Sequence, residues 1–195
     1  MDDPSHLIHI ENNSLQYTVS NRKIEQIIFV ACQALHVDGH EVSIQFIDEP
    51  QIQELNEQYR QINRPTDVLS FPQVDWKSPL MANIENIKKS EIGRSKFVKK
   101  DHSPIEVLGD IVICPSMALN NAIQINQSLD KEVCFLLIHG LLHLCGHDHE
   151  MENDEILMLD QQKKIMQLLN EYSTNDTSPK PIWQNCIQQK EARNV

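Results

Sequence analysis

Apolar residues recur along the chain with two spacings, which predict alternating strands and helices. Alternating or branched apolar residues predict strands at about 6–10, 42–47, 68–71 and 107–113. Apolar residues three and four positions apart predict helices at about 22–35, 50–59, 116–124, 130–145 and 153–169. The branched residues of the last strand favour the centre of the sheet. We therefore expect an α/β (α+β) fold, a mixed sheet of about four strands packed with about five helices.

Two segments lack this periodicity. Residues 76 to about 105 are polar and charged, which predicts a long loop that is either functional or disordered. Residues 172–195 begin with a run rich in serine, threonine and asparagine, which predicts a disordered tail. We therefore expect one domain over residues 1–171, with neither segment in its core.

Charge limits the partners that such a domain can bind. A net charge of −11 argues against a protein that coats nucleic acid by bulk electrostatics, so contact with RNA would need a local basic surface, and no DNA partner is expected. Six basic residues gather in the long loop and form either a solvated loop or an arm that follows phosphates. They are Lys88, Lys89, Arg94, Lys96, Lys99 and Lys100.

The sequence also predicts a cytoplasmic protein without a membrane partner. Its N-terminus is acidic where a signal peptide is basic, and the longest apolar run, residues 133–138, is too short to span a membrane. The five cysteines are an odd number without CxxC spacing, which favours packed, reduced thiols.

Histidines are concentrated in one short stretch, residues 139–149. On a helix His139 and His143 lie about 40° apart, one turn from each other, which suits two ligands of one ion. His149 can join them only if the helix ends, and Gly146 stands where a left-handed residue would turn the chain back. Three imidazoles with an open fourth position are typical of catalytic zinc.

Several features of this stretch admit a second interpretation. A single histidine would more often be solvated or hydrogen-bonded, and His147 could replace His149 as the third ligand. Asp148 either accepts a hydrogen bond from an imidazole or is a surface turn residue. The identity of the metal is open, because three imidazoles also accept nickel, copper or cobalt.

The spacing of the three histidines and the glycine resembles the metzincin metalloprotease motif, with one departure. Gly140 occupies the position where those proteases carry the glutamate that acts as general base. Without this carboxylate, peptidase chemistry is disfavoured, and a metal-dependent protease is only the third of the functions considered.

The chain most closely resembles the YbeY endoribonucleases, bacterial proteins of ribosomal RNA maturation. The matching blocks are His139–Leu144 with Gly146–His149, Leu55–Asn56 through Tyr59–Arg60, Pro65–Pro72 and Leu108–Ile113. They occur in family order over about residues 7–169. The resemblance implies one zinc ion at His139, His143 and His149, a functional Arg60, and cleavage of single-stranded RNA.

The implied role is maturation of the 3′ end of small-subunit ribosomal RNA and ribosome quality control, with precursor RNA and the ribosome or its proteins as partners. Arg60 would balance charge on the phosphate. The alternative interpretation is an exposed arginine at a helix end without a functional role. Thr66, Asp67 and Ser70 could line the site. A turn cap and a strand edge would account for these polar residues equally well. The nucleophile and the proton acceptor stay open, and the alternative function is a non-catalytic zinc-binding ribosome assembly factor.

Overall fold

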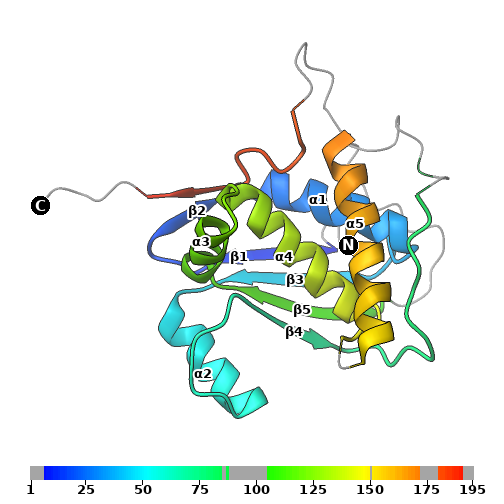
Figure 1. Cartoon of the computed structure of the whole chain (residues 1–195), viewed down its shortest axis with the longest axis horizontal. Coiled ribbons are helices and arrows are strands. Elements are labelled where there is room, and N and C mark those ends of the chain that lie inside the picture. The colour runs from blue at the N-terminus through cyan, green and yellow to red at the C-terminus, as the bar shows by residue number, and fades with distance from the viewer. Residues whose placement is uncertain (1–6, 85–86, 88–104, 150, 172–179, 191–195) are drawn as a thin grey trace, which may run out of the picture.

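The computed structural model describes residues 7–84, 87, 105–149, 151–171 and 180–190. A four-stranded sheet in the order β1-β3-β5-β4 lies at its centre (Figure 1). Its strands are β1 (Ile8–Asn12), β3 (Glu41–Phe46), β5 (Val107–Ile113) and β4 (Val68–Pro72). β1, β3 and β5 are parallel and β4 is antiparallel to β5, so the sheet is mixed, as predicted.

Five helices accompany the sheet in the described residues, close to the predicted positions. They are α1 (Asn21–Leu35), α2 (Glu49–Arg60), α3 (Pro115–Gln124), α4 (Leu129–Leu144) and α5 (Glu152–Glu171). The predicted fold class is confirmed, and β5 lies inside the sheet between β3 and β4. Most helix ends differ from the predictions by one or two residues, because apolar spacing alone does not fix the terminal residue of a helix.

The helices cover the two faces of the sheet unequally. α4 lies against β4 and β5, with α1 beside it, and the large core fills this side (Figure 1). Successive residues of a strand point to opposite faces, so Ile111 faces this core whereas Val112 faces a small cluster with Ile52 of α2. α4 is therefore largely buried, and it supports the side chains at its end.

Part of the C-terminal segment that was predicted to be disordered is ordered in the structure. Residues 187–189 form β6 (Ile187–Gln189), which pairs antiparallel with β2 (Tyr17–Val19), a strand that the sequence analysis missed. Ile182, Trp183 and Cys186 are buried. The prediction fails for residues 180–190 because a few apolar side chains anchor an otherwise polar stretch. Residues 172–179 and 191–195 lie outside the described residues.

The structure describes residues 76–84, 87 and 105 of the predicted loop at 76–105. Residues 76–84 contain no helix or strand, yet they are ordered by backbone hydrogen bonds to distant elements. The Ala82 N–H donates to Gln161 Oε1 at 2.8 Å, and the Asn83 N–H donates to the Ala34 carbonyl at 2.8 Å. This part of the loop thus packs on α1 and α5. The six basic residues between 88 and 100 lie outside the described residues.

The structure bears out the expectation of packed, reduced thiols. All five cysteines are free and buried. Among the described residues, no helix combines the length and apolar character needed to cross a membrane.

Candidate metal centre

His139 and His143 lie one turn apart in the last part of α4, as their spacing predicts. Their ring centroids are 4.7 Å apart, and the two Nε2 atoms face each other at 3.1 Å. Both rings are partly buried. The two imidazoles thus converge on one point beyond the helix surface.

The Nδ1 atom of His139 is held by a glutamine of α5. The amide nitrogen of Gln162 donates to the Phe135 carbonyl at 3.0 Å, which turns its Oε1 atom toward His139 Nδ1 at 3.4 Å. Because this oxygen only accepts, Nδ1 of His139 carries the proton and Nε2 presents a lone pair. This is the arrangement that orients a histidine ligand toward a metal.

His143 is oriented in the same way by the backbone. Its Nδ1 atom donates to the His147 carbonyl at 2.9 Å, and a carbonyl can only accept. The Nε2 atom of His143 therefore also presents a lone pair, opposite that of His139. Two facing lone pairs at 3.1 Å repel each other unless a cation lies between them, so this donor set fits a metal ion.

Gly146 supplies the turn that brings His149 to the same point. Its φ of +84° is left-handed, and the N–H groups of Gly146 and His147 donate back to the carbonyls of His143 and Leu142. These two bonds form a Schellman motif, which ends the helix and reverses the chain. The His149 ring then lies 5.7 Å from that of His139 and 5.1 Å from that of His143.

The three histidines form a group that could hold a metal ion. One nitrogen of each ring lies within 4.8 Å of the others. Burial, and after it the neighbouring His139, lowers the pKa of His143 to about 4. Burial also lowers the pKa of His139. Both imidazoles are therefore neutral at pH 7, the state that binds metals.

His147, the alternative ligand, points elsewhere. It is buried, and its Nε2 atom donates to the Leu80 carbonyl at 2.7 Å. Asp148 accepts the backbone N–H of His149 at 2.7 Å, which agrees with its interpretation as a turn residue. Of the two candidates for the third position, the structure brings only His149 to the other histidines.

Residues 76–80 support the turn from outside. The indole N–H of Trp76 donates to the Leu144 carbonyl at 2.8 Å, and the Leu80 N–H donates to the Cys145 carbonyl at 3.0 Å. These carbonyls belong to the end of α4, where helical partners are missing. The segment thus closes the helix end and also accepts the His147 ring, so it fixes the backbone that orients His143 and His149.

Gly140 has a packing role. A Cβ atom at this position would lie 2.8 Å from Ile111 Cγ2 and 3.1 Å from Ser70 Oγ. The glycine therefore lets α4 approach the sheet, and the glutamate of the metzincin motif has no room here. The departure from that motif is a requirement of this fold.

We expect Gly140→Ala to lower the free energy of unfolding by about 1 kcal/mol. Overpacking against Ile111 costs about 1–3 kcal/mol, which exceeds the gain of about 1 kcal/mol in helix propensity. Denaturant titration measures the change. Gly39→Ala is the control, because its Cβ would meet nothing within 4 Å and stability should stay within about 0.5 kcal/mol. An equally stable Gly140→Ala variant would contradict the packing argument.

Arg60 is the last residue of α2 and is exposed. Its positive charge lies close enough to lower the pKa of His139, although burial is the main cause. Asp67 acts on the same histidine with the opposite sign. The structure therefore places Arg60 on the side of the histidine group, with no hydrogen bond or ion pair to another described residue.

The three polar residues near β4 have structural contacts. Asp67 accepts the Val68 N–H at 2.9 Å and the Asn121 amide at 2.7 Å, which ties β4 to α3. Thr66 donates to Asp67 at 3.2 Å. Ser70 faces Gly140. These contacts support a structural interpretation of all three.

Sequence reasoning missed the residues that orient the histidines. Gln162 lies 23 positions from His139, and Trp76 lies 68 positions from Leu144. Both contacts depend on how helices and loop pack, and a lone glutamine or tryptophan carries no spacing signal. One local signal concerns Phe135, which lies one helical turn before His139. Its carbonyl accepts the hydrogen bond from the Gln162 amide.

Comparisons with known proteins find relatives of this chain. The family model described as Endoribonuclease YbeY matches residues 8–170. Endoribonuclease YbeY of Clostridioides difficile is 35% identical over 78% of this chain and 89% of its own. That of Clostridium beijerinckii is 33% identical over 84% and 98%. The solution structure of TM1509 from Thermotoga maritima is 28% identical over 81% and 85%, with a TM-score of 0.49.

Proposed function

Because the chain belongs to the YbeY family of endoribonucleases, we propose that it cleaves single-stranded RNA during ribosomal RNA maturation. The observation that carries the proposal is the group of three imidazole nitrogens at the end of the buried helix α4. The finer proposal is 3′-end processing of small-subunit ribosomal RNA and ribosome quality control in the cytoplasm, in contact with the ribosome or its proteins.

We propose His139, His143 and His149 as the ligands of one zinc ion. Three neutral imidazoles are the ligand set of catalytic zinc, which leaves a position for water or substrate. Bound there, zinc would lower the pKa of water toward about 7 and polarise a phosphoryl oxygen. The partly buried rings of His139 and His143 support the proposal, since their nitrogens are already aimed and need little rearrangement.

The chain's own residues have separate tasks in this proposal. Gln162 and the His147 carbonyl hold protons on Nδ1 of the two helical histidines, so both Nε2 atoms stay available. Arg60 is the cation that balances the negative charge growing on the phosphate during cleavage. Its exposed guanidinium has five N–H donors and can bind two phosphate oxygens at once.

Removal and return of the metal tests this function. Purified protein, without a histidine tag, is treated with a chelator and incubated with labelled single-stranded RNA. We expect cleavage to stop and to recover on addition of one equivalent of zinc per chain, whereas magnesium, which prefers oxygen ligands, should not restore it. Elemental analysis gives the resident metal.

The alternative, a non-catalytic assembly factor, predicts another result. In that case chelation would lower stability but no RNA cleavage would be seen before or after metal is added. Cleavage that persists in the metal-free protein would contradict the proposed chemistry outright.

A further inference from the structure

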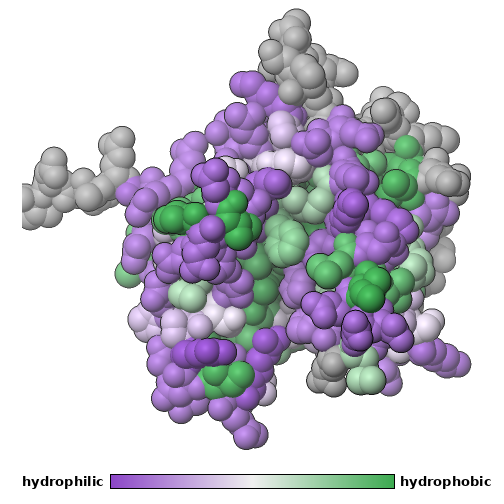
Figure 2. Space-filling model, in the orientation of Figure 1, coloured by the Kyte–Doolittle hydropathy of each residue, from purple (hydrophilic) through white to green (hydrophobic). Residues whose placement is uncertain are grey.

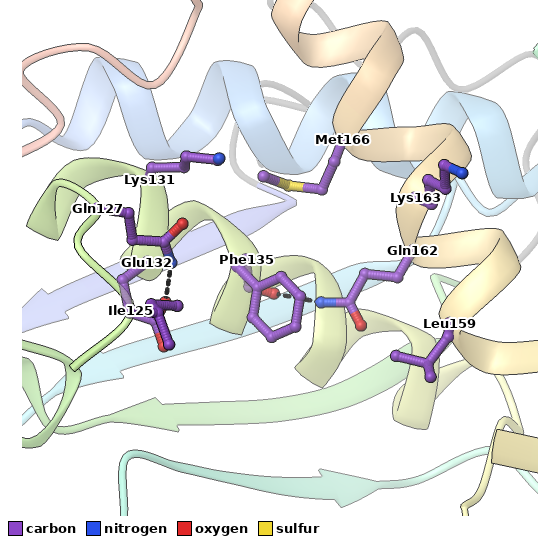
Figure 3. A pocket seen from close by; sticks show the side chains of 9 residues that line it. All are labelled: Ile125, Gln127, Lys131, Glu132, Phe135, Leu159, Gln162, Lys163 and Met166. Carbon is purple, nitrogen blue, oxygen red and sulfur yellow. Dashed lines mark hydrogen bonds between the residues drawn. The ribbon is translucent and has the colours of Figure 1, made fainter. Parts of the chain in front are cut away.

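A pocket of about 430 Å³ opens beside the histidine group, between the loop after α3, α4 and α5. Figure 2 shows this face hollowed near its middle, with hydrophobic residues inside and hydrophilic residues around them. Figure 3 shows Phe135 at the centre of the pocket, with Leu159 and Ile125 on either side. The pocket has the size and the mostly apolar lining of a small-molecule or nucleotide site.

Phe135 connects this pocket to the proposed metal ligands. Its ring lies nearly parallel to that of His139, with an interplanar angle of 14° and 6.3 Å between centroids. Gln162 lines the pocket and at the same time holds His139. A group seated on the Phe135 ring would therefore lie close to the histidine group.

Two lysines stand at the rim of the pocket. Lys131 of α4 and Lys163 of α5 are exposed, and neither forms an ion pair with any residue in the described parts of the chain. Figure 3 shows them on opposite sides of Met166. In a chain with a net charge of −11, two unpaired cations at one pocket form a local basic site.

The same lysines also border a second pocket. This pocket of about 470 Å³ shares Lys131, Lys163 and Met166 with the first and extends to Pro181 and Trp183. The two hollows therefore adjoin each other at the lysine pair. Pro181 and Trp183 lie beyond residue 170, where the match to the family model ends.

We propose that this groove binds the RNA strand next to the cleavage site, with one unpaired base stacked on Phe135 and a phosphate between Lys131 and Lys163. The second pocket would take the neighbouring nucleotide. Bases stack on aromatic rings without regard to sequence, and lysines bind the phosphates between them. The inference rests on the proposed function, because the pocket is assigned to RNA on the ground that it lies beside the proposed metal ligands.

The acidic residue of the pocket does not oppose this occupant. Glu132 is buried, and its carboxylate accepts a hydrogen bond from the Gln127 amide. Burial raises the pKa of Glu132, which favours the neutral carboxyl group over the carboxylate. An apolar side chain of a partner protein would also fit the cavity, but it would leave both lysines without a counter-charge.

The test measures affinity for RNA apart from cleavage. Fluorescence anisotropy follows the binding of labelled single-stranded RNA to the whole chain with its metal chelated, so that the RNA stays intact. We expect Lys131→Gln combined with Lys163→Gln to weaken binding about tenfold at low salt and to reduce the salt slope by about 0.7, the value for one phosphate contact. Lys164→Gln is the matched control, because this lysine pairs with Asp160 and lines neither pocket.

Substitutions of Phe135 test whether an RNA base stacks on its ring. Phe135→Leu keeps the volume but removes the aromatic face, and we expect about tenfold weaker binding, whereas Phe135→Tyr should bind like the unmodified chain. Circular dichroism checks that each variant is folded. Loss in the lysine variant alone would overturn the stacked base. Unchanged affinity in both would overturn the groove as an RNA site and favour a protein side chain in it.

The two proposals fail separately. If the chain does not cleave RNA, binding and its dependence on Phe135 can still be measured. If the groove is wrong, metal-dependent cleavage persists while Phe135→Leu and the lysine variant bind and cleave RNA normally.

Discussion

Replacing His143 by alanine is expected to lower the rate of RNA cleavage by about 10³-fold or more, since the ion and its several kcal/mol of charge stabilisation are lost together. The ring centroid of His143 lies 4.7 Å from that of His139 and 5.1 Å from that of His149. Without it two nitrogens remain, and one of them, on His149, belongs to an exposed residue.

The structural cost of this change should be much smaller. The substitution leaves the His147 carbonyl without its donor, which costs about 1–3 kcal/mol if water does not replace the bond. Cleavage is measured under single-turnover conditions, bound zinc by elemental analysis and folding by circular dichroism. His9→Ala is the control, because this exposed histidine of β1 pairs, among the described residues, only with Glu41. A folded His143→Ala variant that keeps both zinc and activity would refute the ligand assignment.

The fold followed from the sequence wherever burial produced a long periodic pattern. The five helices and the four strands of the main sheet that the structure describes each have at least one buried side, so their spacing reports their structure. β2 and β6 escaped because each has three residues and their pairing joins Thr18 to a residue 170 positions away. Such short strands are stable only through tertiary contacts, here the burial of Cys186 and Ile187, which no local pattern encodes.

The candidate site was predictable to the extent that it is local. The helical spacing of His139 and His143 and the glycine at 146 lie within eight residues, so helix geometry alone brought the rings together. The choice between His147 and His149 was not local. It depends on the Leu80 carbonyl, which accepts the His147 ring from a segment read as a loose loop. Gly140 could be recognised from the sequence as a departure from a protease motif. Its packing on Ile111 could not be predicted, because it depends on how the sheet lies against α4.

Replacing Arg60 by alanine is expected to lower the rate of RNA cleavage by about 10²-fold, with metal content and stability unchanged. One preorganised donor facing developing charge contributes an effect of this size. The side chain of Arg60 is exposed and makes no hydrogen bond or ion pair to the described residues, so its removal leaves no partner unsatisfied. The rate constant of a single turnover separates the chemical step from RNA binding.

A second substitution, Arg60→Lys, distinguishes the charge of the Arg60 side chain from its geometry. Arg60→Lys keeps the positive charge but loses the planar fork that binds two phosphate oxygens, so activity should recover only in part. Arg64→Ala is the matched control, because this arginine is also exposed and lies four residues further along, in the connection to β4. If Arg60→Ala lowered RNA affinity and left the single-turnover rate unchanged, Arg60 would be a binding residue. If Arg64→Ala had the same effect, neither arginine would have a specific role, and the loss would reflect the general charge of this surface.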